Sequence, residues 1–230
     1  MAKRTFFVAG TDTDVGKTLV SAGLLAAANQ QGLSTVGVKP IAAGCEITEE
    51  GLRNSDALLL QQMASIKLSY AQVNPIAFEP AIAPHIAAQQ QGRRLDADRI
   101  AALCRGVMMQ PADFMVIEGA GGWRVPLNHR QTLADVAKLL RTPVILVVGM
   151  KLGCINHTLL TVEAIVKDGL RLAGWVANRA EPQMSCYDEN LATLKSMLSA
   201  PLLAEIPYLE TCTAEAVASY IDLAPLIADQ

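Results

Sequence analysis

Residues 5–18, TFFVAGTDTDVGKT, constrain the fold of this chain more than any other segment. An apolar run, Thr5–Ala9, is followed by a polar turn, and Gly16-Lys17-Thr18 then opens a helical pattern over Lys17–Gln30. In this context the pattern predicts a phosphate loop. The backbone N–H groups of the turn and the helix N-terminus face bound phosphates, Lys17 supplies a positive charge, and the hydroxyl of Thr18 is a ligand for Mg²⁺. The competing interpretation is an ordinary strand-to-helix connection in which GKT is a chance cap.

The loop departs from the plain GxxxxGK[ST] pattern at its first glycine. Counted back from Gly16, that position is Thr11, and Gly10 lies one residue earlier. The segment between the two glycines is therefore one residue longer than in the plain form.

Short β-rich runs alternate with longer helical patterns along the rest of the chain. Several runs, such as VILVV at 144–148, are apolar throughout, as expected for parallel strands that are buried on both faces. This alternation predicts a P-loop NTPase-like α/β fold: one domain, residues 1–230, with a mostly parallel central sheet and helices on both faces. The expected strands are Thr5–Ala9, Thr35–Val38, Phe114–Ile117, Val144–Val148, Leu172–Ala177 and Leu202–Ile206. The expected helices are Lys17–Gln30, Ser55–Ala64, Asp96–Met109, Thr132–Leu140, Ile155–Lys167, Tyr187–Leu198 and one around Ala214–Ile227.

One stretch carries too many prolines for a regular element. Asn74–His85 holds Pro75, Pro80 and Pro84. Proline lacks the backbone N–H that helices and sheets need. The stretch is expected to be an ordered surface loop.

Composition excludes several classes of function. Hydrophobic residues make up 51% of the chain, and 19 Lys and Arg against 22 Asp and Glu give a formal net charge of −3. No positive field is available to attract nucleic acid or a membrane surface, so neither is an expected partner. The longest apolar run, Pro143 to Met150, is too short to span a bilayer, and the N-terminal run is too short for a signal peptide. Five scattered cysteines without a CxxC pair indicate a reducing compartment, and a cytoplasmic location is expected.

Charged residues follow several expected strands, at the sheet edge where the phosphate loop also lies. Glu118 precedes a glycine-rich turn, as expected for a carboxylate that helps to hold Mg²⁺; the alternative is a solvated acid. Lys39 ends the second strand, where its ammonium would neutralise a transferring phosphoryl group or an anionic intermediate; the alternative is an exposed lysine. Asp56 begins a helix and is interpreted either as a site residue or as a first-turn acid that the helix dipole favours.

Uncharged candidates lie at two further strand ends. Asn178 ends the fifth strand, and its amide would either read a purine edge or cap a turn. Cys154 and Asn156 follow the fourth strand. For Cys154 a packed thiol is favoured over a nucleophile, because no neighbouring signature supports nucleophilic catalysis.

These segments together resemble the dethiobiotin synthase family. The resemblance is carried by GTDTDVGKT at 10–18 and EGAGGW at 118–123, which together separate this family from other P-loop proteins, and it extends to about Leu209. Further matching segments are Lys39-Pro40, Arg53-Asn54-Ser55-Asp56, Asn74-Pro75, Pro84-His85, Pro126-Leu127, KLGCINH at 151–157, GWVAN at 174–178 and Glu205-Ile206-Pro207.

The resemblance implies an ATP- and Mg²⁺-dependent ligase of biotin biosynthesis that works as a homodimer. One amine of 7,8-diaminononanoate would capture CO2, supplied from bicarbonate, as a carbamate. ATP would phosphorylate the carbamate, and the second amine would displace phosphate to close the ring of dethiobiotin.

The resemblance also assigns roles to individual residues. Thr18, Asp56 and Glu118 are implied as Mg²⁺ ligands, while Lys17 and Lys39 are implied as catalytic lysines, Lys39 acting on the carbamate and its mixed anhydride. The implied nucleotide-binding residues are Asp14, Val15, Gly16, Lys17, Thr18, Leu19, Asp56, Glu118, Gly119, Ala120, Gly121, Asn178, Pro207, Tyr208 and Leu209, the last four around the adenine. The implied substrate-binding residues are Lys39, Ala43, Gly121, Gly153, Cys154 and Asn156, with Gly153–Asn156 meeting the substrate carboxylate across the dimer interface.

One position departs from the family pattern. Many members carry Ser or Thr where this chain has Ala43, and that hydroxyl would hydrogen-bond the carbamate. Losing one such bond costs on the order of 1 kcal/mol, or roughly tenfold in efficiency, without changing the reaction class.

Three alternatives compete with a synthase. A switch ATPase of the partitioning type carries a second lysine early in the loop, where this chain has Asp12. A cobyrinate-type amidating enzyme needs an ammonia source, usually a glutaminase domain, for which 230 residues leave no room. A diverged nucleotide-binding regulator without synthase turnover stays open as the alternative function.

Overall fold

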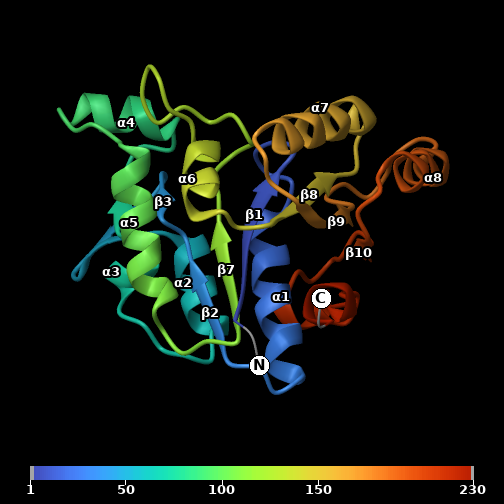
Figure 1. Ribbon diagram of the computed structural model, residues 1–230, viewed down its shortest axis with the longest axis horizontal. Helices are drawn as coiled ribbons and strands as arrows, with labels where there is room; N and C mark the ends of the chain where they lie inside the picture. The colour runs from blue at the N-terminus through green and yellow to red at the C-terminus, as the bar shows by residue number, and fades with distance from the viewer. Residues whose placement is uncertain (1–2, 229–230) are drawn as a thin grey trace.

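The computed structural model describes residues 3–228 and is built around a six-stranded sheet (Figure 1). Its strands are β1 (Arg4–Gly10), β2 (Thr35–Val38), β7 (Phe114–Glu118), β8 (Val144–Gly149), β9 (Leu172–Asn178) and β10 (Leu202–Ile206). They run parallel in the order β10-β9-β8-β1-β7-β2. The predicted parallel sheet is confirmed, and β1 pairs with β7 on one side and β8 on the other, so the loop that follows it lies near the centre of the sheet edge.

Side chains of the strands alternate between two buried faces. In β1, Phe6 and Val8 belong to one apolar cluster, whereas Phe7 and Ala9 belong to the other. The same alternation runs through β8, in which all six residues are buried. Burial on both faces explains why these strands are apolar throughout in the sequence.

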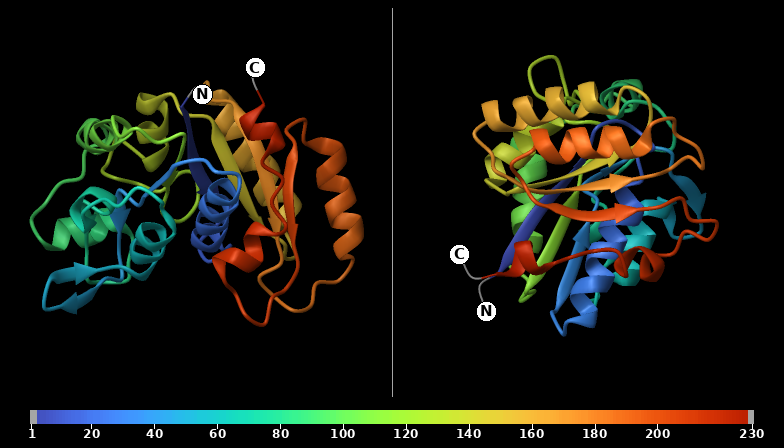
Figure 2. Two further views of the ribbon diagram at one scale, coloured as in Figure 1. Left: turned by 90° about the horizontal axis from the view of Figure 1, so that it is seen from below. Right: turned by 90° about the vertical axis from the view of Figure 1, so that its right-hand side faces the viewer.

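Helices cover both faces, as predicted. One face carries α1 (Lys17–Gln30), α9 (Ala214–Ala218) and α10 (Ala224–Ile227), with α2 (Ser55–Met63) packed against α1 and β2. The other face carries α5 (Ala97–Met108), α6 (Leu133–Leu140), α7 (Cys154–Lys167) and α8 (Tyr187–Met197). The right-hand view of Figure 2 shows α7 and α8 on one side of the strands and α1 with the C-terminal segment on the other. Apart from the C-terminal segment, the predicted helices and strands end within one residue of the observed bounds.

The C-terminal helix predicted around Ala214–Ile227 is wrong, because that segment forms the two short helices α9 and α10. Pro225 lies in the first turn of α10, where its missing N–H is tolerated. Inside one continuous helix the same proline would remove a hydrogen bond and clash with the preceding turn. Between the two helices, the N–H of Asp222 donates instead to the carbonyl of Leu203 at 2.8 Å.

The surface loop predicted over Asn74–His85 is confirmed only for its middle, since residues 79–83 form no helix or strand and are exposed or half-buried. Ile76–Ala77 forms β6, which pairs in parallel with β3 (Ile41–Ala42), and Phe78 is fully buried. Pro84 begins α4 (Pro84–Gln90), again at a first-turn position that suits proline.

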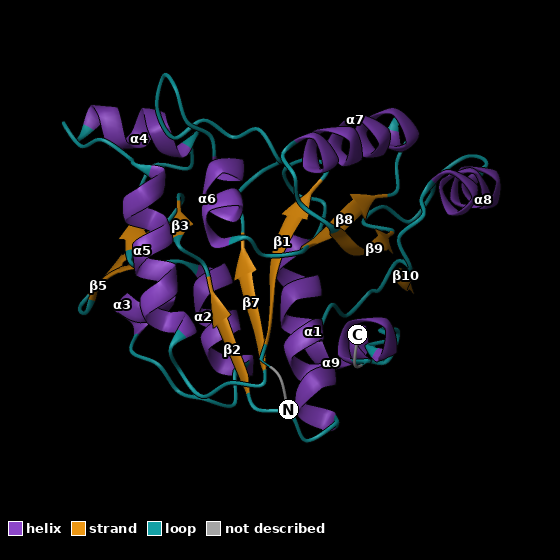
Figure 3. Cartoon of the chain, in the orientation of Figure 1, coloured by secondary structure: helices purple, strands orange, loops and turns teal. Residues whose placement is uncertain are grey.

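Besides β3, β6 and α4, three further short elements had no counterpart in the sequence pattern. They are α3 (Tyr70–Val73) and the antiparallel hairpin of β4 (Glu46–Thr48) and β5 (Gly51–Arg53), which lies at the edge of the molecule in Figure 3. Elements of three or four residues are too short for a helical or strand periodicity to be recognised in the sequence.

Two features of the described residues bear on the surroundings of the chain. Within residues 3–228, no helix has both the length and the apolar character needed to cross a bilayer. All five cysteines are free: Cys45, Cys104 and Cys154 are buried, and Cys186 and Cys212 are exposed.

Candidate active site

The phosphate loop joins the end of β1 to the start of α1. Gly16 caps α1 with φ +86°, a left-handed conformation that glycine adopts without strain. The side chain of Lys17 turns back over the loop, where its ammonium donates to the carbonyl of Asp12 at 2.8 Å. A Cβ on Gly10 would lie 2.9 Å from that ammonium, so the glycine leaves room for the lysine. The loop is therefore built as the sequence predicts, with Gly10 in place of the displaced first glycine.

Asn178, at the end of β9, fixes this loop from the neighbouring strand. Its Nδ2 donates to the carbonyl of Val15 at 2.9 Å, and the side chain is buried. A Cβ on Gly16 would lie 2.2 Å from the same nitrogen. Only a residue without a side chain fits there, so Asn178 and Gly16 together set the path of the loop.

Four side chains from four segments meet beside the loop. The ammonium of Lys39 lies 2.7 Å from Oδ2 of Asp56 and 2.5 Å from Oε1 of Glu118. The hydroxyl of Thr18 donates to the same Glu118 oxygen at 2.8 Å. Lys39 and Glu118 are buried, and Oε2 of Glu118 has no hydrogen-bond partner among the described residues. The structure therefore brings together the lysine and the two carboxylates that the sequence singled out.

Burial and neighbouring charges shift the pKa values of Lys39 and Asp56 in opposite directions. Burial alone would lower the pKa of Lys39, but the charges of Glu118 and Asp56 and their hydrogen bonds raise it above its ordinary value. Burial opposes ionisation of Asp56, yet the charge and hydrogen bond of Lys39 hold its pKa below the ordinary value. The lysine is therefore a permanent cation and Asp56 a permanent anion near neutral pH.

Lys17 differs from Lys39, because within residues 3–228 its ammonium bonds the carbonyl of Asp12 and no carboxylate. Burial, and after it the charge of Lys39, lowers the pKa of Lys17 from 10.5 to about 8. A phosphate bound in the loop would supply the missing negative charge.

A cavity of about 960 Å³ opens over these residues. Its walls include ten of the residues predicted for the site: Asp14, Gly16, Lys17, Thr18, Leu19, Lys39, Ala43, Asp56, Ala120 and Gly121. Three other predicted residues are not among those that line the cavity: Val15, Glu118 and Gly119. The cavity is large enough to hold two ligands side by side, with the phosphate loop and Lys39 facing the same space.

Other predicted residues lie outside this cavity. Pro207, Tyr208 and Leu209 follow β10 next to the strand end of Asn178, and the side chain of Tyr208 is half-exposed. Gly153 caps α7, Cys154 is buried, and Asn156 is exposed in the first turn. Cys154 is thus the packed thiol that was expected, and burial raises its pKa.

The start of α7 is linked to the phosphate loop by an ion pair. Nζ of Lys151 lies 3.2 Å from Oδ2 of Asp12. The residue between Lys151 and Gly153, Leu152, is 92% exposed. In the first turn of α7 Cys154 is buried and Asn156 is exposed, and neither is among the residues that line the cavity.

Two parts of the cavity wall were missed from the sequence. Ala81–Pro84 and Arg124–Pro126 line it, and both are loop segments whose apolar or isolated residues carry no chemical signature. Arg124 is held by Asp168, at the end of α7, through bonds of 2.6 and 3.2 Å, and Trp123 donates to the same carboxylate at 2.8 Å. The spacing of residues in the sequence could not predict the ion pair of Arg124 and Asp168, which lie 44 positions apart.

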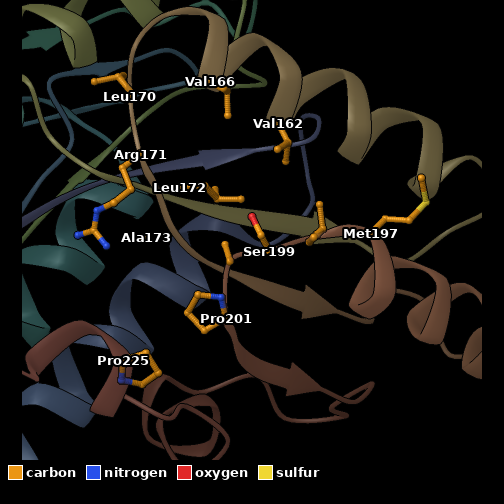
Figure 4. A pocket seen from close by; sticks show the side chains of 12 residues that line it. Val162, Val166, Leu170, Arg171, Leu172, Ala173, Met197, Ser199, Pro201 and Pro225 are labelled. Carbon is orange, nitrogen blue, oxygen red and sulfur yellow. The ribbon is translucent and has the colours of Figure 1, made fainter.

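A second cavity, of about 560 Å³, lies away from these residues (Figure 4). It is bounded by the end of α7, the start of β9 and the segment after α8, with Val166, Leu172 and Pro201 among its walls. None of the predicted site residues lines it, and Arg171 is the one charged side chain among its lining residues. Ten of the predicted site residues line the larger cavity instead.

Comparison with known proteins identifies the fold and the family of this chain. The profile of a family described as an AAA domain matches residues 4–216. The fold is similar to a ParA family ATPase from Chlorobium tepidum TLS, with a TM-score of 0.58 at 13% identity, covering 100% of this chain and 95% of that one. It is also similar to cobyrinic acid a,c-diamide synthase from Mycobacterium smegmatis with bound ATP analog and magnesium, with a TM-score of 0.56 at 15% identity, covering 95% and 92%. At such low identity these likenesses establish the P-loop fold alone.

Sequence similarity is much closer to one kind of enzyme. The chain is 59% identical over 227 residues, 99% of each chain, to the ATP-dependent dethiobiotin synthetase BioD of Cellvibrio japonicus. The similarity runs through both the phosphate loop and the segment around Glu118. This chain therefore belongs to the family of ATP-dependent dethiobiotin synthetases.

Proposed function

We propose that this chain closes the ureido ring of dethiobiotin from 7,8-diaminononanoate and CO2, with release of ADP and phosphate. As a member of the dethiobiotin synthetase family, the chain is an ATP-dependent ligase of biotin biosynthesis. The observation that carries the substrate proposal is the ammonium of Lys39, held at Glu118 and Asp56 in the wall of the cavity that the phosphate loop also lines. A fixed cation in that place can neutralise both a carbamate and the phosphoryl group that it receives.

The nucleotide phosphates would bind along the loop. Backbone N–H groups of Asp14 to Leu19 and the N-terminus of α1 would face the phosphate oxygens, and the ammonium of Lys17 would move from the carbonyl of Asp12 to the β- and γ-phosphates. The reaction would then depend on positioning and charge neutralisation, since the protein supplies no nucleophile.

The chemistry proceeds in three steps. An amine of the substrate adds to CO2, forming an N–C bond and losing a proton, which gives a carbamate. A carbamate oxygen attacks the γ-phosphorus, and ADP leaves. The second amine attacks the carbonyl carbon of the mixed anhydride, the C–O bond to the phosphoryl group breaks, and phosphate leaves with the ring closed. Lys39 would stabilise the negative charge of the carbamate and of the anhydride through these steps.

The residues present fit a magnesium ion. Asp56, Thr18 and Glu118 offer only oxygen atoms, which Mg²⁺ prefers, and the buried Oε2 of Glu118 has no partner within residues 3–228. A Mg²⁺ ion commonly binds one or two carboxylates together with substrate phosphates rather than an all-protein cage. When bound, it would neutralise charge that develops on the phosphate oxygens.

The adenine and the substrate carboxylate would lie at the ends of the site. The Asn178 nitrogen bonds the carbonyl of Val15, while its amide oxygen accepts no hydrogen bond from the residues that the structure describes. With Pro207, Tyr208 and Leu209 it would line the adenine pocket. The substrate would lie along Ala43 and Gly121, both in the cavity wall. Its carboxylate would meet the first turn of α7, Gly153, Cys154 and Asn156, of a second copy.

A homodimer is proposed because the residues of that turn do not line the cavity of their own chain. Apolar side chains continue along the outer face of α7, where Leu160 is 57% and Val166 61% exposed. Light scattering of the protein in solution should give twice the mass of the chain. The variant Leu160→Glu, which places a charge on this face, should give the mass of one chain.

We also propose a cytoplasmic location. Five free cysteines, two of them exposed, suit a reducing compartment. Location can be tested by fractionating cells that express the tagged chain.

The proposed reaction is tested by supplying MgATP, bicarbonate and 7,8-diaminononanoate and measuring ADP and dethiobiotin together. The proposal expects one ADP for each dethiobiotin, and neither product when the diamine is omitted. ATP binding without either product would instead support the alternative, a nucleotide-binding regulator.

A further inference from the structure

The main chain of Lys39 is fixed by the segment Tyr70–Asn74. The N–H of Lys39 donates to the carbonyl of Val73 at 2.8 Å, and its carbonyl accepts from Nδ2 of Asn74 at 2.6 Å. Val73 and Asn74 are both buried. Because both peptide groups are bonded, the position of Lys39 follows the position of this segment.

The helix that carries Asp56 is fixed by the residue before it. Asn54 is the N-cap of α2, and its Oδ1 accepts from the N–H of Ala57 at 3.2 Å. The N–H of Asn54 itself donates to the hydroxyl of Tyr70 at 2.7 Å. Asp56 lies in the first turn of α2, so the placement of Asn54 sets the placement of its carboxylate.

The hydroxyl oxygen of Tyr70 links the segment that fixes Lys39 to the residue that caps α2. The Tyr70 hydroxyl accepts from Asn54 and donates to Oδ1 of Asn74 at 3.0 Å. Its ring packs against the apolar core, with the guanidinium carbon of Arg53 4.2 Å from the ring centroid. Burial raises the pKa of Tyr70, so the hydroxyl keeps the proton that it donates.

We propose that Tyr70 is a positioning residue for ring closure, whose hydroxyl holds Lys39 and Asp56 at their separation of 2.7 Å. The inference rests on the proposed function, in which the lysine acts on the carbamate and the carboxylate on Mg²⁺. Without the hydroxyl, the buried N–H of Asn54 and the amide oxygen of Asn74 each lose a partner. The two segments are then free to shift relative to each other, although no contact with substrate has been removed.

The test is the variant Tyr70→Phe, which keeps the ring and its contact with Arg53. The kcat for dethiobiotin should fall roughly tenfold, as expected for the loss of one buried bridging hydrogen bond. The Mg²⁺ concentration for half-maximal binding of adenylyl imidodiphosphate, measured by calorimetry, should rise several-fold. Affinity for the same nucleotide at saturating Mg²⁺ should stay within about twofold, because the Tyr70 hydroxyl bonds Asn54 and Asn74 rather than the phosphate loop.

The variant Thr35→Val is a matched control. Thr35 is fully buried, and its hydroxyl accepts from the N–H of Ser65 at 3.0 Å and donates to Asn29 at 2.8 Å. The substitution removes these two bonds, together with a longer one of 3.4 Å to the hydroxyl of Ser65. A similar fall in thermal stability is expected, with kcat and the Mg²⁺ midpoint unchanged. If Tyr70→Phe resembles Thr35→Val in both readouts, the positioning role is overturned.

The two readouts separate this inference from the proposed function. Failure of the unaltered protein to form dethiobiotin would overturn the proposed function. The Mg²⁺ midpoint would still decide the role of Tyr70, because binding of the nucleotide analogue needs no turnover.

Discussion

Nζ of Lys39 lies 2.5 Å from Oε1 of Glu118, and the hydroxyl of Thr18 donates to that same oxygen at 2.8 Å. Glu118 ends β7, Lys39 follows β2 and Thr18 lies in the first turn of α1, so three neighbouring elements meet at one carboxylate oxygen. The carboxylate is fully buried. It aligns the phosphate loop with the cation that we propose acts on the carbamate.

The variant Lys39→Gln should lose turnover but keep nucleotide binding. The amide can still donate to Glu118, so the fold is retained, but the positive charge is gone. Removing one preorganised electrostatic group typically costs about 10²- to 10³-fold in kcat. Steady-state assays and calorimetry with adenylyl imidodiphosphate measure the two effects.

An exposed lysine serves as the control for that variant. Lys195 pairs with Glu205 at 3.5 Å on the surface, and Lys195→Gln should leave kcat unchanged. Undiminished ring closure by Lys39→Gln would remove the role assigned to this lysine.

Affinity for ATP should fall as pH rises above 8. The pKa of Lys17 is lowered to about 8 by burial, so in the nucleotide-free protein the ammonium is lost above that pH. Phosphates favour the charged form, and binding must then take up a proton, which weakens affinity by up to about tenfold per pH unit. Calorimetry of ATP binding between pH 7 and pH 9.5 measures this slope.

A rise in pH above 8 affects the stability of the fold in the opposite direction to ATP affinity. In the unfolded chain the lysine stays protonated up to about 10.5, so the unfolded state binds more protons between pH 8 and pH 10.5. This group alone therefore makes the nucleotide-free protein more stable as pH rises through that range. The variant Lys17→Gln should bind ATP weakly with no such slope, and a wild-type affinity that is constant across the range would contradict the prediction.

The variant Gly16→Ala should disable the phosphate loop. It combines a left-handed φ of +86° with a Cβ that would lie 2.2 Å from Nδ2 of Asn178, whose bond to Val15 must then break. Affinity for ADP, measured by calorimetry, should fall roughly a hundredfold, well beyond the ~1 kcal/mol of backbone strain.

Gly32 separates strain from steric clash. Its φ is +78°, but a Cβ there meets nothing within 4 Å. Gly32→Ala should thus cost only about 1 kcal/mol of stability and leave ADP affinity unchanged. Equal loss of affinity in both variants would show that the contact with Asn178 does not matter.

The variant Ala43→Ser should improve the enzyme. Ala43 lines the cavity that holds Lys39, at the position where many family members carry a hydroxyl. A serine there adds one hydrogen bond to the carbamate, which is expected to raise kcat/KM for the diamine by up to roughly tenfold. An unchanged or lower kcat/KM would show that the carbamate lies elsewhere.

Much of the fold could be predicted from the sequence, because its strands are buried on both faces. The runs at β7, β8 and β9 are apolar up to their last residues, Glu118, Gly149 and Asn178, and the phosphate loop fixes where β1 ends and α1 begins. The short elements could not be predicted. β3 and β6 have two residues each, and α3 has four, too few to establish a period.

The same distinction applies to the site. Lys39, Asp56 and Glu118 could be singled out because charged residues at strand and helix ends stand out from apolar surroundings. The hydrogen bonds of Tyr70 to Asn54 and of Asn74 to Lys39 could not be predicted, since they join residues 16 and 35 positions apart. Arg124 was missed for the same reason, because its partner Asp168 lies on another element.

In the proposed reaction ATP phosphorylates a carbamate made from CO2. The fate of the bicarbonate oxygen atoms tests this step. The chain would be supplied with MgATP, 7,8-diaminononanoate and fresh [¹⁸O]bicarbonate, and phosphate and dethiobiotin analysed by mass spectrometry within seconds. Because the attacking carbamate oxygen stays on phosphorus when the ring closes, the account predicts one ¹⁸O in phosphate for each dethiobiotin formed. Phosphate whose new oxygen comes only from water, or that forms without dethiobiotin, would mean that ATP is hydrolysed rather than used in ring closure.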